Sequence, residues 1–370
     1  MTEEVDSGKA TDMAQEARAE RAAEQVPASG DEPAAKRARV EGAEQPAAAE
    51  ASRESGGSDG AATSAAPQPA AAKSGSPSPP PTLPAQSGSA LSAAFSEDKG
   101  CRQTMEDVCV MQLDARPGGA PAGCRLSHFS VFDGHGGAQC ASFAAAGLHA
   151  AVLKAGLLSK GLGADGKPDA KACKAAVVEG FKSTDELLLK ECAAKQWADG
   201  ACAVAVWVLQ ELVLVANVGD AKCVLARLPD KPPAGSAAPA KPKALVLTKE
   251  HTALLERQRI EKAGGTVVDG RLAGRIQIAR SFGDAAFKKL GCSSSPDVTA
   301  FPLTGRDCFL LLGCDGFWGV FGAQEAVDTA QALLAEGQAP KAVTNRLLNI
   351  AIREKRCKDN CSVLLVRFGA

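Results

Sequence analysis

The sequence has no tyrosine, and its 370 residues include only 12 phenylalanines and three tryptophans. No run of residues approaches the roughly 18 consecutive apolar positions that a membrane-spanning helix requires. The first residues, MTEEVDSGKATD, are acidic and polar, whereas a secretory signal is basic and then apolar. We therefore expect an intracellular protein, cytoplasmic or nuclear or both, with no membrane partner.

Two further absences concern cysteine pairing and positive charge. The 13 cysteines are odd in number and include no CxxC pair, so neither a disulfide framework nor a zinc ribbon is indicated. Most of them are expected to be small buried thiols. The net charge of −1 divides into −6 for residues 1–90 and +5 for the remainder. Neither part is basic enough to predict nucleic-acid binding.

Residues 1–90 are poor in the side chains that build a hydrophobic core. They hold 24 alanines but only six residues of Ile, Leu, Val, Met or Phe, and no cysteine. Such a segment cannot bury enough apolar surface to offset chain entropy, so we predict a disordered tail rich in Ala, Pro and Ser. Within it, PAAKRARV at 33–40 resembles a nuclear import signal; the alternative is an incidental cluster of charge. Residues 91–370 are then expected to form one folded domain.

The folded part alternates between short apolar runs and helical periods. The runs Ala203–Leu209, Leu212–Val218 and Lys222–Arg227 follow one another too closely for crossover helices. Antiparallel hairpins are therefore expected, and a doubly wound parallel sheet is disfavoured. Helices are predicted wherever apolar residues recur at helical spacing, which they do over 140–152, 173–188, 323–334 and 343–350. This segregation favours an α+β fold with packed sheets and helices outside, and the proline-rich stretch 229–243 is expected to be a surface loop.

Acidic residues stand at the ends of several predicted strands. Asp133 follows HFSVF in a DGHGG sequence, and Asp315 follows CFLLLGC. Four further acids occupy comparable places: Asp220 after LVLVANVG, Asp359 before the last strand, and Glu106 and Asp107 before VCV. The structural alternative for such a turn is an aspartate that bonds its own backbone. Because strand ends at one edge of a sheet are neighbours in space, these acids are candidates to converge.

A convergence of carboxylates has a direct chemical implication. Without a cation it would be costly, because like charges within a few ångströms force protonation, whereas a divalent cation stabilises the ionised cluster. All-oxygen ligands favour Mg²⁺ or Mn²⁺ over zinc. Two such ions about 3.5–4 Å apart would make hydroxide available near neutral pH. The pattern therefore predicts a metal site suited to phosphoryl chemistry.

Six motifs occur in a fixed order: RQTMEDV, SVFDGHGG, NVGDAK, IARSFGD, LLGCDGFWGVF and KDNCSVLLV. In this order they resemble the type-2C (PPM) family of metal-dependent serine/threonine protein phosphatases, over about residues 95–368. The segment EHTALLERQRIEKAGGTVVDGRLAG resembles most closely the family's integrin-linked-kinase-associated type. The resemblance implies a four-layer α-β-β-α sandwich of two antiparallel sheets flanked by helix pairs, with a metal cleft at one edge. It also implies phosphoserine and phosphothreonine proteins as substrates, and we expect a monomer.

The resemblance implies a role for each candidate site residue. Five of them would hold two Mg²⁺ or Mn²⁺ ions, with Asp133 bridging both, Glu106 and the Gly134 carbonyl on one, and Asp315 and Asp359 on the other. Asp220 would serve a weaker third metal position together with Asp315, and Asp107 would support the site without binding an ion. Arg102 would bind the phosphate, because a planar guanidinium matches its oxygens. His135 would protonate the departing alkoxide after in-line attack by a hydroxide that bridges the ions, without a covalent phosphoenzyme.

Some positions depart from the family's pattern and leave alternatives open. Gly319 replaces an aspartate that is common in this loop, and Lys222 stands where arginine is usual. Arg102 could instead be a surface charge, and His135 could merely shape the glycine turn. A pseudophosphatase that binds phosphoproteins without turnover is the competing function, and a phosphatase of small phosphoesters is another. Because a pseudophosphatase usually lacks a metal carboxylate and none is missing here, an active protein phosphatase is predicted.

Overall fold

The structure, a computed structural model, describes residues 91–230 and 240–369. The predicted tail 1–90, with its import-like segment 33–40, lies outside these residues, as does most of the proline-rich stretch 229–243. Within the described part, no helix is long and apolar enough to cross a membrane. All 13 cysteines lie in this part and are unpaired, and all except Cys101, Cys109 and Cys308 are buried. The expectation of buried thiols is therefore confirmed.

The first sheet joins strands from opposite ends of the described chain. Its five antiparallel strands lie in the order β1 (Leu91–Asp98), β13 (Cys361–Phe368), β12 (Asp307–Gly313), β6 (Lys222–Arg227) and β7 (Lys243–Val246). β1 pairs with β13 along its whole length, so that Asp98 lies opposite Cys361. The chain that leaves β1 therefore begins beside the residues that precede β13.

The second sheet is also antiparallel, and its central strands are buried. Its main strands lie in the order β11 (Asp297–Pro302), β5 (Leu212–Val218), β4 (Gly200–Leu209), β3 (Leu126–His135) and β2 (Val108–Gln112), and the short β10 (Phe282–Gly283) pairs with β4. Every residue of β4 is buried. Val204 and Val206 pack in the core between the sheets, whereas Trp207 packs in the core under the helices. A strand with two buried faces has no polar face, and this explains its continuous apolar run.

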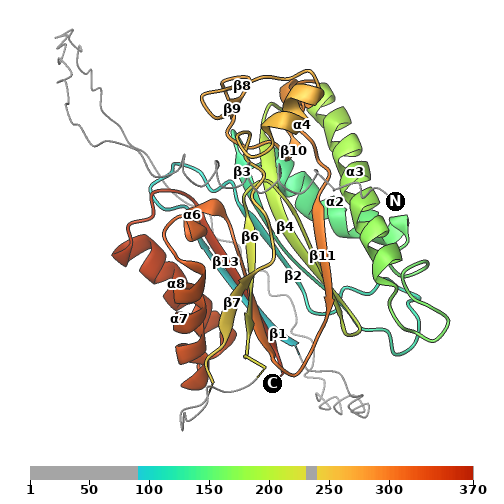
Figure 1. Cartoon of the computed structure of the whole chain (residues 1–370), viewed down its shortest axis with the longest axis vertical. Helices are drawn as coiled ribbons and strands as arrows, with labels where there is room; N and C mark the ends of the chain where they lie inside the picture. The colour runs from blue at the N-terminus through green and yellow to red at the C-terminus, as the bar shows by residue number, and fades with distance from the viewer. Residues whose placement is uncertain (1–90, 231–239, 370) are drawn as a thin grey trace, which may run out of the picture. The chain divides into compact units, whose positions relative to one another are not determined.

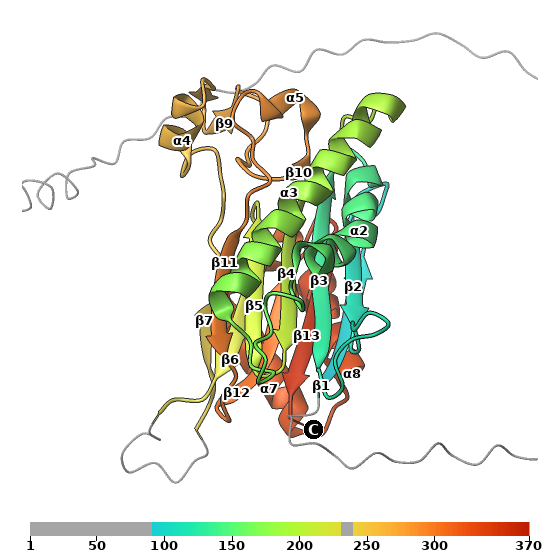
Figure 2. The ribbon, with the colours of Figure 1, turned by 90° about the vertical axis from the view of Figure 1, so that its right-hand side faces the viewer.

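Helices cover the outer face of each sheet, so the layers run helix, sheet, sheet, helix (Figure 1). The second sheet carries α2 (Gln139–Ala155) and α3 (Ala170–Lys195), which face the viewer in Figure 2. The first sheet carries α7 (Ala323–Ala335) and α8 (Pro340–Asn349), and α8 continues into the π-helical turn η1 (Ile350–Glu354). The remaining elements are short: α4 (Arg257–Lys262), α5 (Ala285–Lys288), α6 (Asp315–Trp318), β8 (Val267–Val268) and β9 (Arg271–Leu272). The predicted four-layer sandwich is confirmed.

Local signals fix the ends of the long helices. The Asp169 carboxylate caps α3 by accepting hydrogen bonds from the backbone N–H groups of Lys171 (2.8 Å) and Ala172 (3.2 Å). Gly156, in the left-handed conformation with φ 113°, ends α2. The two helices can pack closely because Gly180 has no side chain; a Cβ there would lie 2.3 Å from Val152 Cγ2. This close packing covers the second sheet beside the strand that carries Asp133.

Candidate metal centre

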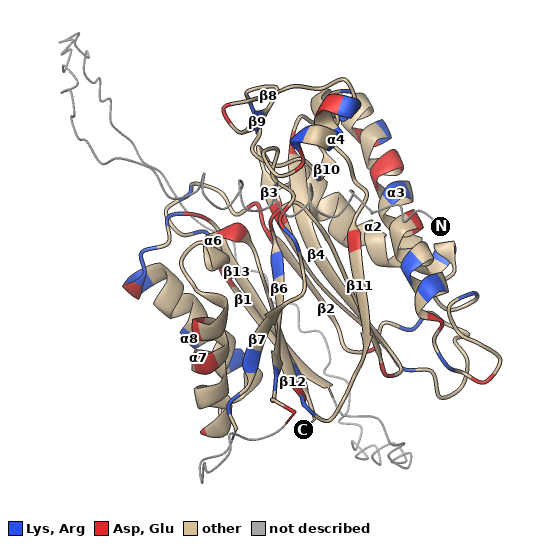
Figure 3. Ribbon diagram, viewed as in Figure 1, with Lys and Arg blue, Asp and Glu red and all other residues tan. Residues whose placement is uncertain are grey.

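Carboxylates from both sheets meet at one edge of the sandwich. They stand at the ends of five strands: Asp133 in β3, Asp220 after β5, Asp315 after β12, Glu106 before β2 and Asp359 before β13. Figure 3 shows acidic residues gathered between α6 and the end of β3. A cavity of about 410 Å³ is lined by four of these acids, Asp220 being the exception, and also by Arg102 and His135. The structure thus brings the predicted site residues into one region.

Three aspartates form the closest group. Asp133, Asp220 and Asp315 each offer one oxygen, and these oxygens all lie within 4.8 Å of one another. The Asp315 backbone N–H donates to Asp133 Oδ2 at 3.2 Å. Burial, followed by the neighbouring Asp315 charge, raises the pKa of Asp133 well above its usual value. Burial likewise raises the pKa of Asp315 to about 6. The three carboxylates carry charge of one sign, and a divalent cation among them would offset their repulsion.

Asp107 adds a second sign of a cation site. Its side chain is buried, and Oδ2 accepts a hydrogen bond from Ser362 Oγ at 2.7 Å. Its other oxygen, Oδ1, has no hydrogen-bond partner within the described residues, and burial raises the pKa of Asp107 to about 6. Buried carboxylate oxygens normally have partners. The orphaned oxygen and the three clustered aspartates fit the hard, oxygen-ligated divalent cation that the sequence predicts.

A thiol also lies in this group but does not change the type of ion. Cys314 Sγ lies within 4.8 Å of one oxygen each of Asp107 and Asp133. Burial raises the pKa of Cys314 well above its usual value, which favours the protonated thiol. It instead donates to the Asn360 carbonyl at 3.4 Å and accepts from the Ser362 N–H at 3.1 Å. The available ligands therefore remain oxygens.

Glu106 and Gly134 approach each other closely beside Asp133. A Cβ at Gly134 would lie 2.4 Å from the Glu106 carbonyl oxygen, so only glycine fits this position. The Glu106 carboxylate accepts hydrogen bonds from Thr104 Oγ1 at 3.0 Å and from the Gly137 N–H at 3.3 Å. These bonds hold the carboxylate in the wall of the cavity. Both predicted ligands therefore line the same cavity as Asp133 and Asp315.

Asp359 lines the same cavity but is paired with a cation of the protein. Arg102 Nη2 lies 2.6 Å from Asp359 Oδ2, and the two side chains are 62% and 39% exposed. The hydrogen bond and charge of Asp359 raise the pKa of Arg102. An ion pair this exposed contributes little to stability. Opening it would therefore cost little, and it would free Asp359 for a metal ion and Arg102 for a phosphate.

His135 is held by an aspartate that the sequence interpretation did not single out. His135 Nε2 lies 2.8 Å from Asp284 Oδ2, which also accepts a hydrogen bond from Ser281 Oγ at 2.6 Å. Burial alone would lower the pKa of His135, but the hydrogen bond and charge of Asp284 outweigh it and raise the pKa. Asp284 is itself buried, and its backbone N–H donates to the Asp199 carbonyl at 3.0 Å. The imidazole is thus fixed through one ring nitrogen on a rigid support.

Asn360 is a second residue whose role the sequence did not reveal. Its amide donates to the Lys99 carbonyl at 3.0 Å and the Thr104 carbonyl at 2.9 Å. Its Oδ1 accepts from the Glu106 N–H at 2.8 Å. One side chain therefore fixes the whole loop that carries Arg102. Asp284 and Asn360 both lie inside the motifs IARSFGD and KDNCSVLLV, but nothing in their local sequence indicates these distant partners.

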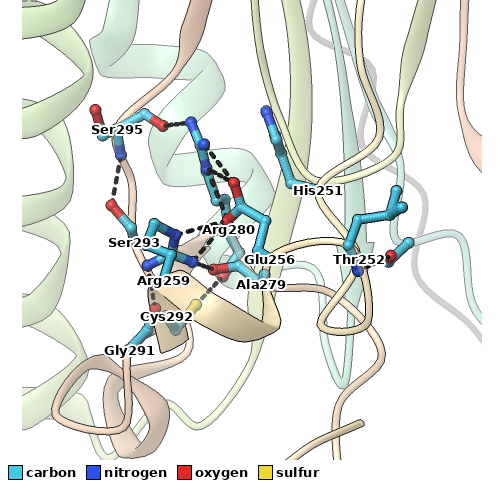
Figure 4. Close-up of polar contacts among 12 residues, drawn as sticks. His251, Thr252, Glu256, Arg259, Ala279, Arg280, Gly291, Cys292, Ser293 and Ser295 are labelled. Carbon is cyan, nitrogen blue, oxygen red and sulfur yellow. Dashed lines mark hydrogen bonds and ion pairs between the residues drawn. The ribbon is translucent and has the colours of Figure 1, made fainter. Parts of the chain in front are cut away.

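A different charged network lies in the segment between β7 and β11 (Figure 4). Glu256 accepts hydrogen bonds from Arg280 Nε at 2.9 Å and from Arg259 Nε at 2.8 Å. Arg280 Nη1 also donates to Asp297 Oδ1 at 2.9 Å. We call Glu256, Arg259, Arg280 and Asp297 the Glu256 network. It joins the start of α4 to the start of β11, and each of its charges faces one of opposite sign.

Comparisons with known proteins agree with this fold and site. A family model described as "Protein phosphatase 2C" matches residues 92–361. Probable protein phosphatase 2C 67 of Oryza sativa subsp. japonica is 48% identical over 284 residues, which cover 75% of this chain and 76% of that protein. The integrin-linked kinase-associated serine/threonine phosphatase 2C of Bos taurus is 36% identical over 299 residues, covering 76% and 77%. The crystal structure of a serine-threonine phosphatase 2C from Toxoplasma gondii shares the fold, with a TM-score of 0.64, 23% identity, and coverage of 77% of this chain and 97% of that one.

The fold, the acidic cleft and these relatives together define a metal-dependent protein serine/threonine phosphatase. The chain belongs to the protein phosphatase 2C family. The predicted family and enzyme class are therefore confirmed. The integrin-linked-kinase-associated type is among the relatives, although the rice protein has the higher identity.

Proposed function

We propose that this chain hydrolyses phosphoserine and phosphothreonine in proteins with two Mg²⁺ or Mn²⁺ ions. The ions would be held by the predicted ligands Glu106, Asp133, Gly134, Asp315 and Asp359, and a third, weaker position would lie at Asp220. The observation that carries the proposal is the convergence of three aspartate oxygens within 4.8 Å at the acidic cleft. When bound, the ions would supply an activated water for in-line attack on phosphorus and would offset the charge of the phosphate.

The chain's own residues would position the phosphate and complete the proton transfer. Arg102, released from Asp359, would present two N–H groups to the phosphate oxygens. His135 would donate a proton to the departing serine or threonine oxygen, and this must occur through Nδ1 because Asp284 holds Nε2. Neither step requires a protein nucleophile, so no covalent phosphoenzyme is expected. Support for both roles comes from the shared cavity that Arg102 and His135 line.

Metal titration of the full chain tests this proposal. Phosphothreonine and phosphoserine peptides should be hydrolysed with Mg²⁺ or Mn²⁺ and not after chelation. Turnover without metal would contradict the metal mechanism. Binding of phosphopeptides without turnover at saturating metal would instead support the alternative, a pseudophosphatase that acts as a phosphoprotein-binding regulator. The monomeric state, the cytoplasmic or nuclear location and the role of residues 1–90 remain predictions from the sequence.

A further inference from the structure

Four exposed basic residues lie beside the metal cleft and take no part in the chemistry described above. They are Lys99 after β1, Arg353 in η1, and Arg356 and Lys358 in the segment that leads from η1 to β13. We call these four residues the basic rim. Figure 3 shows Lys and Arg along this segment, next to the acidic residue at α6.

The backbone turns these side chains outward. Arg356 adopts the left-handed conformation, with φ 59°, which is uncommon for a residue with a side chain. The turn lets the next residue, Cys357, enter the core, where its Sγ donates to the Gly316 carbonyl at 3.1 Å. The Cys357 N–H donates to the Ala351 carbonyl at 2.9 Å. With Cys357 fixed inside, Arg356 and Lys358 on either side of it are left in solvent.

The basic rim is close enough to the cleft to contact a bound substrate. Lys358 immediately precedes Asp359, which lines the cavity. The Lys99 carbonyl accepts the Asn360 amide at 3.0 Å, which places Lys99 on the same edge. Arg353 lies six positions before Asp359, so it is at most about 20 Å away. An extended substrate would cover that distance with about six residues.

The charges of the rim are available for a partner. Neighbouring charges are already paired, Lys355 with Glu325 at 2.8 Å and Arg346 with Glu354 at 2.7 Å. The four rim residues make no ion pair with any described residue. Two exposed acids, Glu97 and Asp98, lie at the end of β1 next to Lys99, so the four basic residues face only two acidic ones there. The rim therefore keeps an excess of positive charge toward solvent.

We propose that the basic rim binds acidic residues that lie within about six positions of the phosphorylated residue, on one side of it, in a substrate protein. This inference rests on the proposed phosphatase function and names a substrate class for it. The phosphate enters the cleft, and the acidic flank lies along Lys358, Arg356 and Arg353. Attraction between exposed charges mainly raises the association rate and the affinity for the substrate, and dissolved salt screens this attraction.

The test compares three phosphothreonine peptides on the full chain: one with acidic residues before the phosphothreonine, one with them after it, and one with neutral flanks. We expect kcat/KM for one acidic peptide to exceed that of the neutral peptide about tenfold at low salt. The advantage should disappear in about 0.5 M salt. It should also disappear in the triple variant R353Q/R356Q/K358Q. A control variant, K154Q/K171Q/K190Q, neutralises three exposed lysines of α2 and α3 and should keep the preference.

Several results would overturn the proposal. One is an equal kcat/KM for all three peptides. Another is a preference for an acidic peptide that persists in the R353Q/R356Q/K358Q variant. Faster turnover of every peptide by that variant would show that acidic residues of the chain's own 1–90 segment occupy the rim. Binding of the same sequences with a non-hydrolysable phosphonate in place of the phosphate needs no turnover. If no peptide is hydrolysed, the phosphatase function fails, yet tighter binding of an acidic phosphonate peptide still supports the rim and equal binding still refutes it.

Discussion

The metal cleft and the Glu256 network both concentrate buried charge, but they do so in opposite ways. In the cleft, Asp133 and Asp315 lie among further carboxylates, and burial, followed by the charge of neighbouring carboxylates, raises their pKa values. In the network, burial would raise the pKa of Glu256, yet hydrogen bonds from Arg280 and Arg259 outweigh it and lower that pKa. The network balances its own charge, whereas the cleft does not. A cluster of charges of one sign therefore indicates a binding site for a ligand of opposite charge. A cluster of alternating charges indicates an ion-pair network that holds parts of the fold together.

The largest expected effect is a loss of kcat that differs between two aspartates of the cleft, Asp133 and Asp220. Asp133→Ala should lower kcat on the order of a thousandfold at saturating metal, because this residue is proposed to bridge two ions. Asp220→Ala should cost about tenfold, since it serves only the weaker third position. Steady-state kinetics with Mn²⁺ titration measures both, and circular dichroism checks that each variant is folded. Equal losses would show that the proposed ligand roles are wrong.

The next prediction tests the charge balance of the network. Glu256→Gln should destabilise the fold by about 3 kcal/mol, because Arg280 and Arg259 then lose a largely buried partner. kcat at saturating metal should change less than about twofold. Urea unfolding measures the first effect, and Glu261→Gln, an exposed glutamate of α4, is the matched control. A loss of metal binding with unchanged stability would instead place Glu256 in the metal site.

The difference between these regions also explains what the sequence could and could not predict. The runs that became β3, β4, β5 and β12 are continuous and apolar, so their strands and the acids at their ends were found. β1 and β11 were missed because LSAAFSED and DVTAFP are only partly buried and β11 ends in a proline. The strands form because β13 and β5 pair with them. Such pairing joins distant parts of the chain and leaves no local pattern.

The same reason applies to the site. Asp133, Asp220 and Asp315 were identified because each directly ends an apolar run, and sheet geometry brings such ends together. Asp284 lies 149 positions from its partner His135, and the Glu256 network depends on contacts between α4, β11 and the chain between them. Sequence motifs contained Asp284 without indicating its partner. Residues that act through a single distant contact therefore needed the structure.

Asp284 lies between the two types of region, because it is a paired carboxylate at the edge of the cleft. Asp284→Asn should lower kcat for phosphopeptides about tenfold, since His135 loses the group that fixes its ring. Hydrolysis of p-nitrophenyl phosphate should fall less than about twofold, because its leaving group needs little protonation. Asp269→Asn is the matched control, because Asp269 is exposed and has a similar φ, 48° against 49°. Equal losses on both substrates would reduce Asp284 to a purely structural role.

The smallest effect concerns the metal-free protein and the unpaired Asp107. Its pKa is raised to about 6 by burial, so the folded state favours the protonated form. Stability from this group is full below the ordinary pKa of a carboxyl and falls as pH rises through 6. With metal removed, the stability of Asp107→Asn relative to the wild type, measured as the free energy of unfolding, should therefore rise by about 1 kcal/mol between pH 5 and pH 7.5.

Urea unfolding of both proteins at the two pH values, in a chelating buffer, measures this gain. Comparing the proteins at each pH cancels the contribution of His128, His149 and His251, whose pKa values are lowered mainly by burial and whose effect on stability has the opposite sign. Saturating Mn²⁺ should abolish the gain, because a cation supplies the positive charge that Asp107 lacks. If the gain were absent without metal, or if it persisted with Mn²⁺, Asp107 would not belong to the uncompensated charge of the cleft.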